Sequence, residues 1–241
     1  MLPDHLHQEI HTWFALPDLA VSPARLSQYR SMLSGAETAR YQRFHFPDDA
    51  HRYLIAHALV RTVLSKYADI QPDRWAFFHG DHGRPEIANH DIPALRFNLT
   101  HTASLVGCVV TLENDCGIDA EKISPRHSPL GIAKRMFSDT EFQELQQLQD
   151  VAHLEYFFKR WTLREAYVKA RGIGISFPTR KLGFEINSEG NIQVTFHADL
   201  RDNTQDWQFE LLRPTPEHIA AVAIRINNRV RKKLITRLVE L

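Results

Sequence analysis

Helix-forming patterns dominate the first third of the chain. Behind Ser22-Pro23, a pair typical of a helix start, Leu26, Tyr29 and Leu33 recur at helical spacing. A stronger helical pattern begins near Asp49, and its apolar positions share one face: Leu54, Ala58, Leu59 and Val63. We therefore expect two helices before the first strand.

Short runs rich in β-branched and aromatic residues follow these helices and predict strands. Three such runs precede a polar linker at Glu113-Asn-Asp-Cys: Trp75 to Phe78, Leu95 to Leu99 and Leu105 to Thr111. A loop rich in helix and strand breakers, from His79 to Pro85, separates the first run from the second. A further strand is expected at Gly117 to Glu121, just after the linker.

The second half repeats this order of elements. Three helical patterns come first: Leu130 to Met136, Ser138 to Leu148 and Val151 to Arg171. Ser138 and Glu141 form a capping-box start, and Gly172 and Gly174 are expected to end the last helix. Four strand patterns follow, with a hairpin turn at Asn187 to Gly190: Leu182 to Ile186, Ile192 to Phe196, Trp207 to Leu212 and Ile219 to Ile226. The end, Asn228 to Leu241, reads as a basic amphipathic helix or a frayed tail.

Helices followed by strands in each half favour an α+β fold over a doubly wound parallel sheet. The predicted architecture is a pseudo-dimer of two similar α+β subdomains within one chain, residues 1–115 and 116–241, although the two halves do not visibly match in sequence.

Composition places the chain among ordinary globular proteins, with 43% hydrophobic and 24% charged residues. Its formal net charge is zero, so no global field attracts nucleic acid or a membrane surface. The longest apolar run, Leu105 to Leu112, is too short to span a bilayer, and no secretory signal is visible at the N-terminus. Cys108 and Cys116 read as free thiols in a reducing cytoplasm, with a disulfide as the alternative. The histidines form no H-E-x-x-H or Cys/His zinc pattern.

Candidate chemistry lies on the strand after the linker and on the last helix. Asp119 and Glu121 point the same way on a strand, and Trp161, Glu165 and Lys169 share one helix face. Three carboxylates and an ammonium suit a hard divalent cation held against a phosphate ester. Taken alone, however, Asp-x-Glu is typical of solvated acids at a strand end. The Glu165–Lys169 spacing fits an exposed ion pair as well as a site, although its neighbours are apolar.

Two further groups of residues are suited to phosphate. Thr100, His101 and Thr102 end a strand with hydroxyl, imidazole and hydroxyl groups, although local backbone bonding explains such a cluster equally. Several arginines lie near turns, and guanidinium groups suit phosphate oxygens, although each alone reads as a surface residue: Arg40, Arg43, Arg52 and Arg84.

Seven segments together, in order, resemble the 4′-phosphopantetheinyl transferase superfamily, in particular its larger single-chain branch that activates surfactin synthetase. They are Asp49 to Arg61, Gly83-Arg-Pro85, Phe97 to Thr102, Gly117 to Glu121, Ile132 to Ser138, Trp161 to Lys169 and Gly172-Ile-Gly174. Each motif is weak alone, whereas seven in the right order are specific.

The resemblance implies coenzyme A bound between the halves and transfer of its phosphopantetheine arm to a serine of an apo acyl or peptidyl carrier protein, releasing 3′,5′-ADP. It implies that Mg²⁺ is held by Asp119, Glu121 and Glu165, and that Glu165, directly or through a metal-bound water, takes the serine proton. Lys169 would contact the pyrophosphate and help the departing ADP.

The remaining implied contacts lie in the first half. Thr100 and His101 would contact coenzyme A phosphate, while Arg52, Arg84 and Arg40 would neutralise the 3′-phosphate end. One chain supplies both halves, so a monomer is expected. Two departures from the family pattern matter: Arg164 replaces a lysine, and Glu37 places an acid on a segment expected to be basic.

Two other hypotheses remain open at this stage. The same acids would serve a Mg²⁺-dependent hydrolase of nucleotide pyrophosphates such as coenzyme A. A non-catalytic binding module would use the basic tail from Arg229 to Arg237 to dock an acidic partner, although the preferred interpretation of that tail is a solvated helix face covering the core with Leu234, Ile235 and Leu238.

Overall fold

The computed structural model describes residues 2–17, 21–80, 82–124, 129–174, 177–226 and 229–240. By its internal contacts the chain divides into two compact units. The first contains Met1–Asn114 together with Lys232–Leu241, and the second contains Asp115–Arg231. The sequence predicts a second subdomain of residues 116–241, whereas in the structure the last ten of these residues belong to the first unit.

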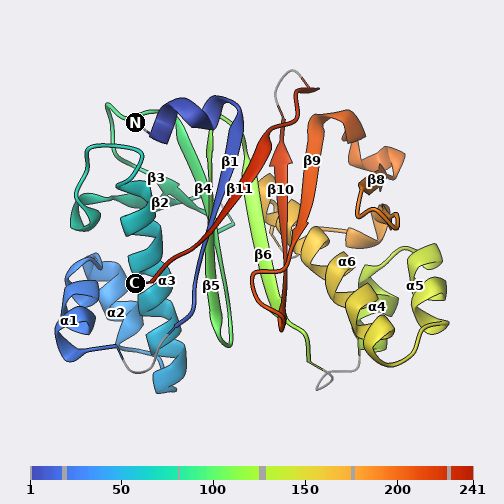
Figure 1. Cartoon of the computed structure of the whole chain (residues 1–241), viewed down its shortest axis with the longest axis horizontal. Coiled ribbons are helices and arrows are strands. Elements are labelled where there is room, and N and C mark those ends of the chain that lie inside the picture. The colour runs from blue at the N-terminus through green and yellow to red at the C-terminus, as the bar shows by residue number, and fades with distance from the viewer. Residues whose placement is uncertain are drawn as a thin grey trace. The chain divides into compact units, whose positions relative to one another are not determined.

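The first unit is built on a four-stranded sheet of order β11-β1-β5-β4 (Figure 1). Its strands are β1 (Glu9–Ala15), β4 (Leu95–Thr102), β5 (Leu105–Leu112) and β11 (Lys233–Leu238). Helix α3 (Pro47–Leu64) packs on β4 and β5 and buries most of its middle and last turns. A short 3-10 helix (Leu2–His7), α1 (Pro23–Ser31), α2 (Gly35–Tyr41) and the hairpin of β2 (Phe77–His79) and β3 (Pro85–Ile87) complete the unit.

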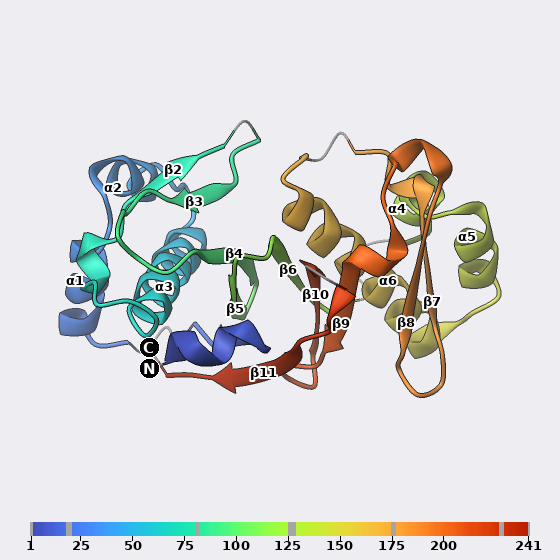
Figure 2. The same ribbon diagram turned by 90° about the horizontal axis from the view of Figure 1, so that it is seen from above.

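The second unit has a three-stranded antiparallel sheet of order β6-β10-β9. Its strands are β6 (Cys116–Lys122), β9 (Trp207–Leu212) and β10 (His218–Arg225). The longest helix, α6 (Asp150–Arg171), packs on β6 and β10. Figure 2 shows the antiparallel hairpin of β7 (Leu182–Ile186) and β8 (Ile192–Phe196) beside α5 (Asp139–Gln146), with α4 (Pro129–Met136) preceding them in the chain.

Local signals set the boundaries of the second unit's helices. The capping box at Ser138 is present, because its side chain and that of Glu141 each bond the other's backbone amide. Helix α6 ends at Gly172, which adopts a left-handed conformation with φ of 63° and so avoids the penalty of a side chain there. These helix ends and the strands of the β7–β8 hairpin are where the sequence predicts them.

The predicted C-terminal helix is wrong. Residues Lys233–Leu238 form β11, which pairs in parallel with β1 from Glu9↔Lys233 to Phe14↔Leu238. Strand β1 was itself missed, and its free edge is what β11 covers. Pairing with a strand more than 220 residues away overrides the helical periodicity, and the β-branched Ile235 and Thr236 favour the extended form.

The basic residues of this C-terminal segment have partners within the chain. Arg229 lies 3.5 Å from Asp206, and Arg231 lies 2.9 Å from Glu210. Lys232 donates to the carbonyl of Leu6, and the Arg237 guanidinium lies over the Trp13 ring. These contacts weaken the hypothesis of a free basic tail that docks an acidic partner.

Cys108 and Cys116 are buried and neither forms a disulfide, which agrees with the prediction of thiols. Among the described residues, no helix combines the length and the apolar character that crossing a membrane requires.

A buried polar network fastens β1 to the chain after α3. The Tyr67 hydroxyl accepts from Trp13 Nε1 at 2.8 Å and lies 2.7 Å from His11 Nδ1, while His11 Nε2 lies 2.8 Å from Glu9. Burial lowers the pKa of His11, and a neutral ring with its proton on Nε2 satisfies every partner. Tyr67 then donates to Nδ1.

Tyr67→Phe should destabilise the first unit, because it leaves Trp13 Nε1 and His11 Nδ1 buried without a partner. We expect a loss of about 1–3 kcal/mol of unfolding free energy and faster hydrogen exchange in β1. Urea denaturation with exchange mass spectrometry measures both. Tyr29→Phe is the matched control, because it removes the hydroxyl of another buried tyrosine of the first unit outside this network. Equal stability of the two variants would contradict this role of Tyr67.

Candidate active site

The acidic residues predicted as a site lie on β6 and α6 of the second unit. These two elements approach unusually closely at Gly117. A Cβ atom at this position would lie 2.1 Å from the Ala166 carbonyl oxygen and 2.5 Å from the Ala170 amide nitrogen. Only glycine permits this contact, and it brings the strand carrying Asp119 and Glu121 against the helix carrying Glu165 and Lys169.

Asp119 is 7% exposed and makes an ion pair with the helix. The Lys169 ammonium lies 2.7 Å from its Oδ1 and also donates to the Ile118 carbonyl over 3.0 Å. The other carboxylate oxygen, Oδ2, is buried and accepts no hydrogen bond from the described residues. A buried, unsatisfied anionic oxygen is costly unless a further cation or donor completes it.

Glu121 and Glu165 share this negative environment. Burial and the nearby Asp119 carboxylate raise the pKa of Glu121 to about 7. A smaller opposing effect comes from Trp161, whose Nε1–H donates to Glu121 over 3.3 Å and lowers this pKa. Burial and Asp119 also raise the pKa of Glu165. The three carboxylates therefore lie near enough to repel one another.

The described residues do not form a ready-made metal site. No three His, Cys, Asp or Glu side chains among them are gathered closely enough to hold an ion. One oxygen of Asp119 is already paired with the Lys169 ammonium of α6. The donors nevertheless fit a hard cation chemically, since they offer carboxylate oxygens, one of them unsatisfied.

Arg164 belongs to the interior of the second unit rather than to this acidic group. Its buried guanidinium bonds the Glu141 carboxylate and donates to carbonyls of Met136, Arg160 and Leu182. The planar fork of arginine makes four such bonds at once, which a lysine ammonium with three donors does not. This explains the replacement at this position as a packing feature.

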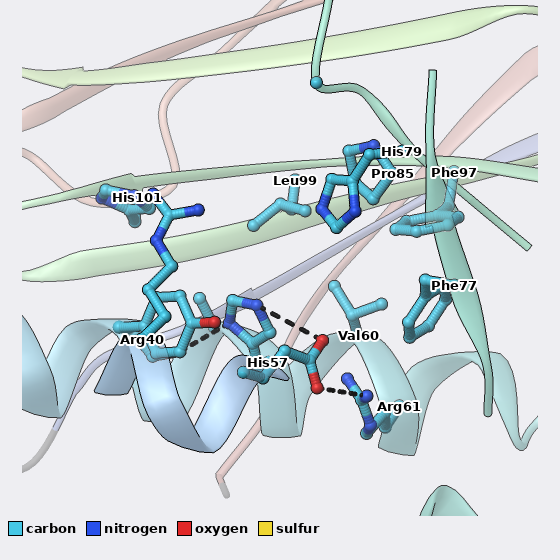
Figure 3. A pocket seen from close by; sticks show the side chains of 14 residues that line it. Arg40, His57, Val60, Arg61, Phe77, His79, Pro85, Phe97, Leu99 and His101 are labelled. Carbon is cyan, nitrogen blue, oxygen red and sulfur yellow. Dashed lines mark hydrogen bonds and ion pairs between the residues drawn. The ribbon is translucent and has the colours of Figure 1, made fainter. Parts of the chain in front are cut away.

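Only some of the first-unit residues that are predicted to bind phosphate lie around the same cavity. A cavity of about 170 Å³ lies between α2, α3, β4 and the β2–β3 hairpin, and both Arg40 and His101 line it. Figure 3 shows Arg40 and His101 toward one end of this cavity and Phe77 and Phe97 toward the other. Arg52, Arg84 and Thr100 are not among its lining residues.

Each of these three has other surroundings. Thr100 is 3% exposed, and because successive strand residues face opposite sides, it points away from the exposed His101. Arg52 forms an ion pair with Asp49 and lies 3.4 Å from the Ala103 carbonyl. Arg84 lies 3.1 Å from Glu86.

Sequence reasoning missed an ion cluster in this cavity. Glu37 pairs with Arg61 at 2.6 Å and with His57 at 3.7 Å, so its charge is satisfied within the unit (Figure 3). Glu37 is also the N3 residue of a capping box that Ser34 begins. The spacing of Ser34 and Glu37 was the available signal, and it explains an acid on a segment expected to be basic.

Comparison with known proteins identifies the family. A model of the 4′-phosphopantetheinyl transferase superfamily matches residues 115–223, and a model of the 4′-phosphopantetheinyl transferase N-terminal part matches residues 20–113. The 4′-phosphopantetheinyl transferase HetI of Nostoc sp. is 33% identical over 172 residues, which cover 71% of this chain and 72% of HetI. The chain belongs to the 4′-phosphopantetheinyl transferase superfamily.

Other similar proteins agree with this assignment. The 4′-phosphopantetheinyl transferase Sfp of Bacillus subtilis is 30% identical over 177 residues, covering 73% of this chain and 77% of Sfp. Among solved structures, a holo-(acyl-carrier-protein) synthase of Bacillus anthracis in complex with CoA (3′,5′-ADP) matches 46% of this chain and 93% of its own, at 18% identity. The TM-score of this match is 0.39.

The superfamily model spans the whole acidic group of the second unit. Asp119, Glu121, Glu165 and Lys169 all fall within residues 115–223. Arg40, Arg52, Arg84, Thr100 and His101 all fall within the N-terminal match, residues 20–113. The family assignment predicted from the seven motifs is confirmed.

Gly117→Ala should separate β6 from α6, because the added methyl group meets backbone atoms that cannot rotate away. We expect about 1–3 kcal/mol of destabilisation and a longer Lys169–Asp119 distance, measured by denaturation and by a crystal structure of the variant. Gly131→Ala is the control, since a Cβ there meets nothing within 4 Å. An unchanged structure and stability for Gly117→Ala would refute the contact.

Glu121→Gln should stabilise the metal-free protein at alkaline pH. A carboxyl with a raised pKa in the fold loses stability as pH rises from about 4.5 to about 7, and glutamine does not ionise. The gain should be small at pH 4 and reach about 1–3 kcal/mol at pH 8. Thermal unfolding in chelator measures it, with Glu189→Gln in the β7–β8 turn as control. A gain that is the same at both pH values would contradict the electrostatic origin.

Proposed function

We propose that this chain is a 4′-phosphopantetheinyl transferase that moves the phosphopantetheine arm of coenzyme A to a serine hydroxyl of an apo acyl or peptidyl carrier protein. The observation that carries the proposal is the superfamily match over 115–223, a range that contains Asp119, Glu121 and Glu165. In the reaction the serine oxygen bonds the phosphorus that carries pantetheine. The bond from that phosphorus to the leaving 3′,5′-ADP oxygen breaks, and the serine proton passes to a base.

Glu165 is the proposed base. Its pKa is raised by burial and by Asp119, so its carboxylate holds a proton more readily than an ordinary glutamate does. It lies on α6, a helix held rigid by the packing of Leu163, Ala166 and Tyr167. A base on a rigid element keeps its orientation toward the substrate hydroxyl.

Asp119, Glu121 and Glu165 would hold Mg²⁺. When bound, Mg²⁺ would neutralise charge on the diphosphate and on the departing ADP. The unsatisfied Oδ2 of Asp119 and the mutual repulsion of the acids support this assignment, because both are relieved by a cation. Trp161 positions Glu121 through its Nε1 donor.

Lys169 would contact the diphosphate and stabilise the leaving group. It is 30% exposed at its side chain, and its long stem allows the ammonium to move from Asp119 to a phosphate oxygen. Arg164 offers no such help because its guanidinium is buried and fully engaged.

The first unit would bind the 3′-phosphate end of coenzyme A. Arg40 and His101 are the best supported of the predicted contacts, since both line one cavity with aromatic walls. Arg52, Arg84 and Thr100 are proposed on the family resemblance, and Arg52 and Arg84 would have to share their charge with Asp49 and Glu86. We also propose that the protein acts as a monomer, because both family parts lie in one chain.

Purified protein with coenzyme A and Mg²⁺ should add one phosphopantetheine to an apo carrier protein, read by intact-mass spectrometry over a small panel of apo carriers. Omitting either coenzyme A or the divalent cation should abolish the mass gain. Unmodified carriers throughout the panel would count against the proposal. Rapid release of 3′,5′-ADP without any carrier would instead favour a pyrophosphate hydrolase.

Glu165→Gln should lower the transfer rate by about 10²–10⁴-fold, because the proton acceptor is lost while shape is retained. The rate of mass gain measures it, and circular dichroism checks the fold. Glu185→Gln, exposed on β7 of the same unit, is the control and should transfer at the wild-type rate. A folded Glu165→Gln protein with full activity would remove Glu165 from the mechanism.

A further inference from the structure

The Lys169 ammonium pairs with the Asp119 carboxylate, which is one of the proposed metal ligands. The ammonium lies 2.7 Å from Oδ1 of a carboxylate that is 7% exposed, and Oδ2 has no hydrogen-bond partner among the described residues. Oδ1 of this carboxylate is therefore paired with Lys169, and Oδ2 is available to another ligand.

We propose that Lys169 is a placeholder cation, which occupies Asp119 in the metal-free protein and keeps metal affinity low until the diphosphate of coenzyme A attracts the ammonium. This inference rests on the proposed function and adds an order to it: metal binds tightly only together with the phosphate-bearing substrate. Lys169 thereby acts on metal affinity as well as on the phosphate.

The charges of the group support this order. Asp119, Glu121 and Glu165 supply carboxylates, and Lys169 supplies the ammonium that faces Asp119 from the helix. A divalent cation at Asp119 would lie beside that ammonium and be repelled by it, and in a partly buried site such repulsion is weakly screened. A diphosphate offers the ammonium new anionic partners and removes the repulsion.

The Lys169 ammonium can move from Asp119 to a phosphate oxygen without any movement of its backbone. Its backbone belongs to the last turn of α6, where Gly172 N–H bonds the Lys169 carbonyl, so the helix holds the residue in place. Only the four-carbon stem has to move. The second contact of the ammonium is a single hydrogen bond to the uncharged Ile118 carbonyl at 3.0 Å, which an anionic phosphate oxygen would replace.

A purely static ion pair makes the opposite prediction. If Lys169 only braced Asp119, its removal would leave the carboxylate misplaced and metal affinity would fall or stay unchanged. In the placeholder account, removal of the ammonium strengthens metal binding without coenzyme A. By thermodynamic linkage, the placeholder also requires that coenzyme A and metal raise each other's affinity by the same factor.

The experiment measures Mn²⁺ binding by the electron paramagnetic resonance signal of free Mn²⁺, with and without coenzyme A and with no carrier present. Lys169→Met should bind Mn²⁺ on the order of 10-fold more tightly than wild type when coenzyme A is absent. Coenzyme A should tighten Mn²⁺ binding in wild type by at least that factor and by clearly less in Lys169→Met. Lys169→Arg keeps the charge and should resemble wild type without coenzyme A.

Two controls make the result specific. Lys159→Met removes a lysine from the same helix that pairs with Glu155 at 3.3 Å, and it should leave Mn²⁺ affinity unchanged. The double variant Asp119→Asn/Lys169→Met should not show the tighter Mn²⁺ binding of Lys169→Met, because that increase in affinity depends on the Asp119 carboxylate. Thermal unfolding of each variant establishes that it is folded.

The outcomes separate this inference from the proposed function. Equal or weaker Mn²⁺ binding by folded Lys169→Met, with wild type still binding Mn²⁺ in the presence of coenzyme A, overturns the placeholder and leaves the Mg²⁺ site standing. No Mn²⁺ binding by any variant, even with coenzyme A, overturns both the placeholder and the metal site. Transfer to an apo carrier, measured separately, decides the transferase itself.

Discussion

The contact between Gly117 on β6 and the backbone of α6 is the constraint on which the rest of the site depends. No side chain separates strand from helix there, since a Cβ would lie 2.1 Å from the Ala166 carbonyl oxygen. Asp119 and Glu121 follow Gly117 at alternate positions along the strand, and Glu165 and Lys169 flank Ala166 on the helix. One close approach thus brings two short sequence patterns into electrostatic range and allows Lys169 to reach Asp119 at 2.7 Å.

Bringing these acids together lowers the stability of the fold, and a functional role explains why the arrangement is kept. Burial and like charges raise the pKa values of Glu121 and Glu165, and one oxygen of Asp119 has no hydrogen-bond partner in the described part of the chain. Proteins retain such strain mainly at functional sites, where a ligand relieves it. The buried Arg164–Glu141 pair of the same unit differs from the acidic group, because each of its charges faces an opposite charge.

Much of the fold could be predicted from local patterns, because α3, α6, β6 and the β7–β8 hairpin each have a periodicity, cap or turn of their own. Strands β1 and β11 could not, since β11 pairs with β1 across more than 220 residues and β1 also pairs with the distant strand β5. In the site, the sequence placed Glu165 and Lys169 on one helix face and Asp119 and Glu121 on one strand face. It did not reveal that Lys169 pairs with Asp119, because that contact depends on packing. The alternation of side chains along a strand could have shown that Thr100 and His101 face opposite sides.

A crystal of the protein grown with coenzyme A and Mn²⁺ tests the central claim most directly, through the anomalous scattering of manganese. The account predicts a single strong anomalous peak in contact with Asp119, close to Glu121 and Glu165, with the Lys169 ammonium turned from Asp119 toward the diphosphate. An ordered coenzyme A molecule without any anomalous peak beside Asp119, or with Lys169 still bonded to that carboxylate, would contradict it.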